Sequence, residues 1–242
     1  MLSANQKKFV NSLKQKKFRN QHNCFVVEGF KMVEELLLSN FETETIFALS
    51  DWATHHPNLK VEVISENELN SISSLITPNK LIAIVKQKEK IISDLSQSLS
   101  IVLDDIQDPG NFGTIIRTAD WFGITNIICS ENCVDVYNPK VIQATMGSLF
   151  RANVFYTNLT TFFSKNQNLT VYGALLNGEN VSQKKLKSKG SILLMGNESK
   201  GISKNLIPFV TEKITIPKFG KAESLNVATA TAILCFECKR LG

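Results

Sequence analysis

The second half of the chain alternates short apolar runs with segments of helical spacing, and this alternation constrains the fold more than any other feature. Strands that alternate with helices form parallel sheets covered on both faces. We therefore predict an α/β domain with a mostly parallel sheet. Its strands are expected near residues 101–103, 126–129, 153–156, 171–175, 192–195 and 213–216. Its helices are expected near residues 111–122, 139–149, 160–165, 202–209 and 224–239.

A smaller α/β unit is predicted ahead of this domain. Its strands are expected near residues 24–29, 46–49, 61–64 and 81–85, and its helices near residues 3–17, 30–39 and 66–75. A charged stretch without apolar periodicity follows the last of these strands, as is typical of a linker. The predicted organisation is a small domain at residues 1–88, a linker at 89–98 and the larger domain at 99–242.

Composition narrows the class of protein. No apolar run reaches the ~18 residues that would suggest a membrane span, and the N-terminus lacks the apolar core of a secretory signal. An organelle transit peptide stays open, because the N-terminus is basic and free of acidic residues. The five cysteines have no disulfide-framework spacing, which fits a reducing compartment. We expect a cytoplasmic protein without a membrane partner.

The first twenty residues carry a cluster of basic side chains and no Asp or Glu. A basic helix of this kind suits the phosphate backbone of a nucleic acid. A solvated helix face explains the same cluster equally well, so both interpretations stay open on this segment alone. The candidate nucleic-acid-binding residues here are Lys7, Lys8, Lys14, Lys16, Lys17 and Arg19.

The first turn whose residues could take part in chemistry follows the strand that ends at Leu103. A Pro-Gly turn leads there into a helix that Asn111 is placed to cap. Arg117 lies in the first two turns of the same helix. Its planar guanidinium could clamp a phosphate, or it could serve as a structural ion-pair partner.

Two further turns suit a ligand. Gly196 and Gly201 bound a loop after a buried strand and allow the backbone to approach a ligand closely, and Glu198 presents a carboxylate beside it. The last turn passes through Gly220 to a helix start near Ser224, where unpaired backbone amides could hold a ligand. Neither a Walker loop nor a GxGxxG sequence occurs, which disfavours a Rossmann methyltransferase or an NAD enzyme.

Three ordered blocks resemble the motifs of the SpoU/TrmH class of RNA ribose 2′-O-methyltransferases, within the SPOUT superfamily. They are DPGNFGTIIRTADWFG from Asp108, GNESKGI from Gly196 and IPKFGKAESLNVATATAI from Ile216. The second block departs from the motif at Ser199, where glycine is commoner. A segment around Thr145 resembles a further family segment, and residues 25–35 resemble the family's accessory substrate-binding domain.

The resemblance implies both a fold and a reaction. The fold is a SPOUT α/β-knot, a trefoil-knotted and mostly parallel sheet, with a small N-terminal α/β substrate-binding domain. The reaction is methylation of a ribose 2′-hydroxyl in structured RNA, rRNA or tRNA with rRNA favoured, with S-adenosyl-L-methionine as cofactor and a homodimer completing the site. The alternative is a catalytically inactive RNA-binding protein on the same scaffold, and methylation of a base is a weaker third possibility.

The resemblance also implies the residues of the site. The implied catalytic residues are Asn111, Arg117, Glu198, Ser224 and Asn226, and Arg117 is also expected to contact RNA. The implied cofactor-binding residues are Met195, Gly196, Asn197, Gly201, Ile216, Leu225 and Asn226. Because a guanidinium stays protonated, with a pKa above ~12, we expect Arg117 to act as a phosphate clamp and oxyanion stabiliser, with base catalysis left open.

No metal site is predicted. Cys235 and Cys238 form a CxxC sequence, but no second CxxC or nearby histidine pair completes a zinc set, so buried helix cysteines are expected instead. The histidine pair at 55–56 and the aspartate cluster at 104–108 also lack partners at ligand spacing.

Overall fold

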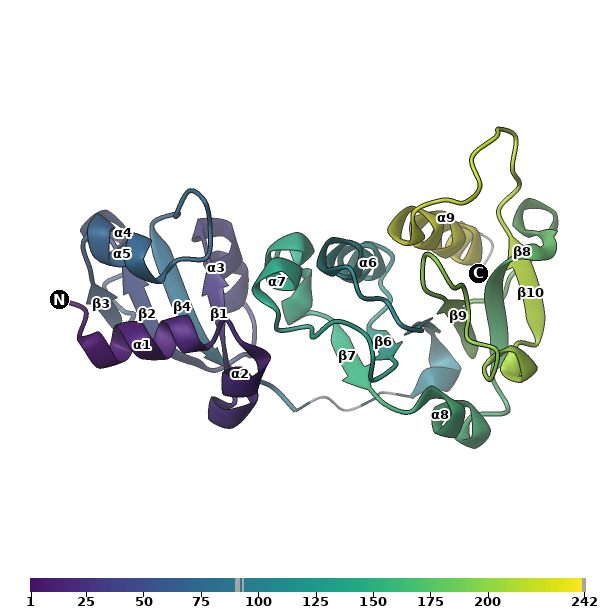
Figure 1. Ribbon diagram of the computed structural model, residues 1–242, viewed down its shortest axis with the longest axis horizontal. Helices are drawn as coiled ribbons and strands as arrows, with labels where there is room; N and C mark the ends of the chain where they lie inside the picture. Colours follow the sequence, from purple (N-terminus) through teal and green to yellow (C-terminus); the bar gives the residue numbers. More distant parts are fainter. Residues whose placement is uncertain (90–91, 93, 241–242) are drawn as a thin grey trace. The chain divides into compact units, whose positions relative to one another are not determined.

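The computed structural model describes residues 1–89, 92 and 94–240. The chain forms two compact units, one of Met1–Glu89 with Asp135–Phe150 and one of Lys90–Val134 with Arg151–Gly242 (Figure 1). Residues 90, 91 and 93 of the predicted linker, and the last two residues of the predicted larger domain, lie outside the described residues. The sequence-based boundaries assign 135–150 to the larger domain, whereas contacts group this segment with the first unit, and the boundaries stay a prediction.

The first unit is built on a four-stranded mixed sheet in the order β1-β4-β2-β3. Strand β4 is antiparallel to β1 and β2, and β2 is parallel to β3. The strands are β1 (Cys24–Glu28), β2 (Thr43–Ala48), β3 (Val61–Val63) and β4 (Leu81–Lys86). The helices are α1 (Ala4–Ser12), α2 (Lys16–His22), α3 (Phe30–Leu37), α4 (Ser50–His55), α5 (Glu66–Ile72) and α7 (Pro139–Thr145), with a 3-10 turn η2 (Ser148–Phe150).

Helices α1 and α5 pack against the sheet of the first unit. Val10 of α1 and Leu69 of α5 share a buried cluster with Ile82 of β4. The single helix predicted at 3–17 is two helices, because Gln15 is extended (φ −101°, ψ 132°) and separates α1 from α2. Helix α5 begins with a capping box in which Ser65 and Glu68 exchange side-chain to backbone hydrogen bonds.

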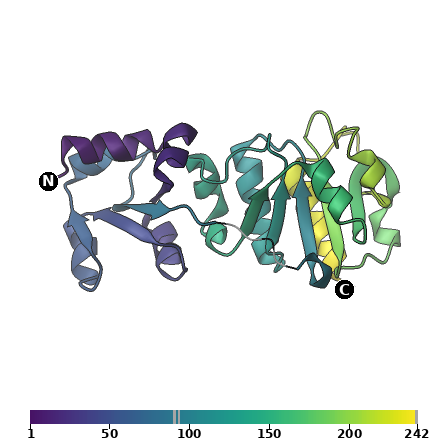
Figure 2. The same ribbon diagram turned by 90° about the horizontal axis from the view of Figure 1, so that it is seen from below.

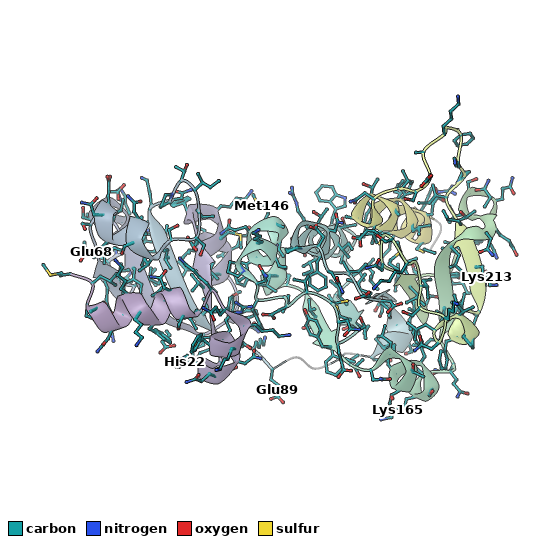
Figure 3. The ribbon with its side chains drawn as sticks, viewed as in Figure 1. His22, Glu68, Glu89, Met146, Lys165 and Lys213 are labelled. Atoms are coloured by element: carbon teal, nitrogen blue, oxygen red, sulfur yellow. The ribbon has the colours of Figure 1, made fainter. Side chains whose placement is uncertain are left out.

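The second unit contains a six-stranded sheet in the order β10-β8-β9-β5-β6-β7, and every neighbouring pair is parallel. This confirms the predicted α/β class. The strands are β5 (Leu99–Leu103), β6 (Asn126–Cys129), β7 (Asn153–Tyr156), β8 (Thr170–Asn180), β9 (Ser191–Met195) and β10 (Glu212–Thr215), the edge strand that carries Lys213 (Figure 3). The helices are α6 (Pro109–Trp121), α8 (Leu159–Lys165) and α9 (Val227–Arg240), with 3-10 turns η1 (Leu95–Gln97), η3 (Val181–Gln183) and η4 (Ile207–Phe209).

Helices cover both faces of this parallel sheet (Figure 2). Phe162 and Phe163 of α8 share a buried cluster with strand residues such as Val102. Helices α6 and α9 contact each other on the opposite face. Successive residues of a strand point to opposite faces of the sheet. Because helices cover both faces, the side chains on both sides of the central strands are apolar, which explains the continuous aliphatic runs in the sequence. Among the described residues, no helix has the length and apolarity to cross a membrane.

Two elements of this unit differ from the sequence-based prediction. The helix expected at 202–209 is only the 3-10 turn η4, because Pro208 lacks the N–H that a continuous α-helix would direct to the carbonyl of Lys204. Strand β8 is longer than expected and its register with β10 jumps, since Gly173 pairs with Lys213 but Glu179 pairs with Ile214. The residues between form a bulge.

Candidate active site

A cavity of about 630 Å³ opens at the carboxyl ends of β9 and β10. Its walls are the β8 bulge, the loop after β9, and the segment between β10 and α9. A volume of this size falls within the ~300–1,000 Å³ that is usual for small-molecule sites. The predicted cofactor-binding residues that line it are Met195, Gly196, Asn197, Gly201, Ile216 and Leu225.

The loop after β9 is closed by its own hydrogen bonds. The N–H of Asn197 donates to the Gly201 carbonyl at 3.1 Å, and the N–H of Gly201 donates back at 2.8 Å. The Asn197 side chain accepts from the N–H groups of Ser199 (2.9 Å) and Lys200 (3.1 Å) and donates to the Asp105 carbonyl at 2.8 Å. Asn197 therefore shapes the loop through its side chain.

Gly196 is required by the packing of this loop against itself. A Cβ at Gly196 would lie 2.3 Å from the carbonyl carbon of Gly201 and 2.3 Å from the nitrogen of Ile202, closer than real Cβ contacts come. Gly201 has φ +69°, a conformation that favours glycine. The sequence suggested glycines for close approach to a ligand, but the close approach at Gly196 is between two parts of the loop.

Three of the predicted catalytic residues form one hydrogen-bonded chain. Nδ2 of Asn111 donates to Oε1 of Glu198 at 2.7 Å, and Nδ2 of Asn226 donates to Oδ1 of Asn111 at 2.8 Å. The Oδ1 atom of Asn226 accepts from the N–H groups of Ala228 (3.0 Å) and Thr229 (3.2 Å), so Asn226 also caps α9. The chain links the loop after β9 to the starts of α6 and α9.

Asp108, and not Asn111, caps helix α6. The carboxylate of Asp108 accepts from the N–H of Asn111 at 2.7 Å, with Pro109 at the first helical position. The expectation that Asn111 caps this helix was wrong. Its amide side chain is instead available to bridge Glu198 and Asn226.

Arg117 and Ser224 are exposed. Ser224 lines the cavity, whereas Arg117 lies six residues beyond Asn111 on α6, about 9 Å along the helix axis. Within the described residues, Arg117 makes no hydrogen bond or ion pair, so its guanidinium is not engaged as a structural ion-pair partner. Its charge remains available to an anionic substrate.

The predicted basic cluster divides into exposed and buried members. Lys7, Lys8, Lys14, Lys16 and Lys17 are exposed on the first unit. Arg19 is only 2% exposed, donates through Nη1 to the Leu13 and Lys14 carbonyls at 3.0 Å, and pairs with Asp135. Arg19 is thus engaged within the protein, and we leave it out of any RNA-binding surface.

The cysteine pair of α9 is buried. Burial raises the pKa of the Cys235 thiol and raises that of Cys238 to about 12, so both favour the neutral thiol at physiological pH. Among residues 1–89, 92 and 94–240, no group of three or more His, Cys, Asp or Glu side chains is arranged to hold a metal ion.

Two parts of the cavity were missed by sequence reasoning. The β8 bulge contributes Ala174, Leu175, Leu176 and Asn177. It depends on Gly178, whose Cβ would lie 2.5 Å from the Ile214 carbonyl carbon. A single glycine between Asn177 and Glu179 does not reveal in the sequence that another strand passes so close. Phe219, on the cavity rim, stands within the third motif-like block at a position to which the sequence gave no role.

Known proteins share this fold over nearly the whole chain. A TrmH-family protein from Porphyromonas gingivalis is 37% identical, with a TM-score of 0.91 and full coverage of both chains. An AdoMet-bound rRNA methyltransferase from Sinorhizobium meliloti is 30% identical, with a TM-score of 0.87 and coverage of 99% of this chain and 97% of that one. The fold is that of the SPOUT class of methyltransferases, as expected from the sequence.

Comparisons of the sequence with known families lead to the same class of protein. The model of the SpoU rRNA Methylase family matches residues 98–236, and that of the MRM3-like substrate binding domain matches residues 5–83. The 23S rRNA (guanosine(2553)-2'-O)-methyltransferase RlmP of Bacillus subtilis is 31% identical over 245 residues, which covers 98% of this chain and 97% of that protein. This chain belongs to the SpoU rRNA methylase family, which confirms the SpoU/TrmH resemblance.

Proposed function

We propose that this chain transfers the methyl group of S-adenosyl-L-methionine to a ribose 2′-hydroxyl of structured RNA, rRNA rather than tRNA. The observation that carries the proposal is the hydrogen-bonded chain Glu198–Asn111–Asn226, in which two amides hold Glu198, and the Glu198 carboxylate belongs to a residue that lines a cavity of small-molecule size. Membership of the SpoU family supports the reaction, and the relative from Bacillus subtilis is named for 2′-O-methylation of 23S rRNA.

The cavity suits the proposed cofactor. Leu175, Ile216 and Leu225 give it apolar walls that fit an adenine ring. Polar residues are present too, because the loop after β9 and Ser224 also line the cavity. We propose that Met195, Gly196, Ile216 and Leu225 line the adenine slot and hold the bound molecule. When bound, S-adenosyl-L-methionine supplies an electrophilic methyl group on a positively charged sulfur.

The acceptor side of the reaction needs a held phosphate and a positioned hydroxyl. The exposed guanidinium of Arg117 can bind a phosphate bidentately and stabilise negative charge that develops on the 2′-oxygen. Asn111 and Asn226 hold Glu198 in a single arrangement beside the cavity, which favours catalysis by positioning. We assign Ser224 a positioning role at the cavity edge.

The first unit is proposed to grip the RNA. Lys7, Lys8, Lys16 and Lys17 are exposed, and Lys14 donates to the Ser73 carbonyl at 3.0 Å while staying exposed. Exposed ammonium groups on one segment can bind phosphates without reading sequence. The match of residues 5–83 to an MRM3-like substrate binding domain supports this role.

We also propose that the chain acts as a homodimer in the cytoplasm. Trp121 of α6 is 85% exposed and Phe236 of α9 is 51% exposed, and these helices contact each other within the second unit. Large exposed apolar side chains on adjoining helices suit a protein interface. The five free cysteines support a reducing compartment.

The test is transfer of labelled methyl from S-adenosyl-L-methionine to rRNA that lacks the modification, with wild type and Glu198→Gln compared. We expect transfer by wild type and strong loss in the variant, because the amide cannot carry the carboxylate charge beside Asn111. Cofactor binding without transfer to any RNA would favour the alternative, an inactive RNA-binding protein. Label recovered in a base would indicate the third possibility, base methylation.

A further inference from the structure

Large apolar side chains stand open to solvent at the rim of the cavity. Phe219 is 96% exposed, Leu176 is 81% exposed and Leu225 is 49% exposed, and all three line the cavity. The segment that carries Phe219, between β10 and α9, projects from the second unit (Figure 1). Apolar side chains gathered at a rim in this way are typical of a binding surface.

Positive charge flanks Phe219 on both sides. Lys218 and Lys221 are exposed, and neither has an ion-pair partner among the residues that the structure describes. A Cβ placed on Gly220 would meet nothing within 4 Å, so no neighbour covers this part of the segment. An exposed aromatic ring with an exposed lysine on each side of it in the sequence therefore stands beside the cavity.

This combination matches an unpaired RNA nucleotide better than other occupants. A base offers a π face for stacking, and its flanking phosphates offer negative charge. The proposed cofactor carries no phosphate, so it does not supply the anionic groups that two exposed lysines can bind. A second copy of the chain also has a net positive charge (+5) and offers less complementarity than a polyanion.

We propose that Phe219 is a stacking platform for an unpaired base next to the methylated ribose, and that Lys218 and Lys221 bind the adjoining phosphates. The inference rests on the proposed function and names how that site holds its substrate. A ribose can present its 2′-oxygen at the cavity only if its nucleotide is held out of a continuous helical stack, and stacking on Phe219 supplies that restraint.

The experiment compares full-length wild type with Phe219→Ala, Phe219→Leu and Phe219→Trp. We expect Phe219→Ala to raise the KM for undermethylated rRNA about 10-fold or more, as removal of one base-stacking partner predicts. Phe219→Trp should restore the KM, and Phe219→Leu should not, because leucine is apolar but has no π face. The Kd for S-adenosyl-L-methionine, measured by calorimetry, should change much less than the KM for RNA in all three, because Phe219 is almost fully exposed.

A second measurement does not depend on turnover. A single-stranded RNA of about 12 nucleotides containing 2-aminopurine should bind wild type with fluorescence quenching, and Phe219→Ala should abolish the quenching while the thermal midpoint stays the same. This assay separates the stacking role of Phe219 from the proposed methyl transfer. If wild type quenches the probe but transfers no methyl group, only the proposed function is contradicted.

Three results would overturn the stacking role. An unchanged KM for RNA together with unchanged quenching in Phe219→Ala would show that Phe219 does not stack on a base. A parallel rise in the Kd for S-adenosyl-L-methionine would make Phe219 a cover for the cofactor. Loss of self-association in sedimentation experiments would make it part of an interface between copies of the chain.

Discussion

Asn111 illustrates how one residue can connect three segments that are distant in sequence. Its side chain accepts from Asn226 and donates to Glu198, while Asp108 takes over the capping of its helix. An amide is suited to this place because it offers both a donor and an acceptor. Asp at this position would put a carboxylate against Glu198. Ala would leave both Glu198 and Asn226 without the hydrogen bond to the Asn111 amide.

Substitution of Asn226 should separate capping from site geometry. Asn226→Ser keeps a capping oxygen but loses the amide that reaches Asn111, so we expect a near-native thermal midpoint with kcat lowered about 10- to 100-fold. Asn226→Ala loses the cap as well and should cost about a further 1 kcal/mol in the free energy of unfolding. Equal activity in Asn226→Ser and wild type would show that the amide bridge is dispensable.

Arg117 should be intolerant of lysine. Because lysine lacks the planar fork, Arg117→Lys is expected to lower kcat/KM for RNA by about 10²-fold, and Arg117→Ala by about 10³-fold. Steady-state kinetics on undermethylated rRNA measure the effect. Arg151→Lys is the matched control, since Arg151 forms a part-exposed ion pair with Asp120 at 2.8 Å. Near-normal turnover by Arg117→Lys would contradict both the clamp and the oxyanion role.

At the scale of elements, the loop after β9 is the part of the site most sensitive to volume. Gly196→Ala would force a Cβ to within 2.3 Å of Gly201, so we expect a loss of S-adenosyl-L-methionine affinity of about 10-fold or more, or a destabilisation of about 1–3 kcal/mol from overpacking. Gly220→Ala is the control, because its Cβ would meet nothing within 4 Å. Calorimetric titration and urea unfolding of both variants measure the two effects.

The capping box of α5 gives a pH-dependent prediction. Hydrogen bonds from the N–H of Ser65, the N–H of Leu2 and the Ser65 hydroxyl lower the pKa of Glu68 to about 2. A depressed folded-state pKa stabilises the fold above the unfolded-state value of 4.5 and loses this effect as pH falls toward 2.

The difference in free energy of unfolding between wild type and Glu68→Gln should therefore be largest at neutral pH and shrink below about pH 4.5. Urea unfolding at pH 7 and pH 3 measures it. Glu66→Gln removes a charge from the same helix start while leaving the capping box intact, and should have the smaller effect at pH 7. A difference that grew on acidification would contradict the capping account.

At the scale of the molecule, the exposed lysines of the first unit should set the salt dependence of RNA binding. Replacing Lys8, Lys16 and Lys17 by Gln should weaken binding and reduce the slope of log K against log salt by about 0.7–0.9 for each phosphate that is no longer neutralised. Replacing Lys185, Lys187 and Lys189 of the second unit is the matched control. Equal slopes for the two triple variants would contradict an RNA role for the N-terminal segment.

Much of the fold could be predicted because periodicity and turn residues act locally. The apolar runs located the strands of the parallel sheet, and the motif-like blocks pointed to Asn111, Glu198 and Asn226, which the structure joins. Burial of Arg19 could not be predicted, because its partner Asp135 is distant in sequence. The β8 bulge was also hidden, since it results from a register jump against β10 that only the folded chain defines.

The position of the transferred methyl group tests the central claim most directly. Wild type and Arg117→Ala would be incubated with labelled S-adenosyl-L-methionine and undermethylated rRNA, and the product would be digested with alkali and separated as nucleosides and dinucleotides. We expect label in an alkali-resistant dinucleotide, because a 2′-O-methyl group blocks cleavage beside it, and loss of this label with Arg117→Ala. Label in alkali-sensitive mononucleotides, or no transfer despite cofactor binding, would contradict ribose 2′-O-methylation by this chain.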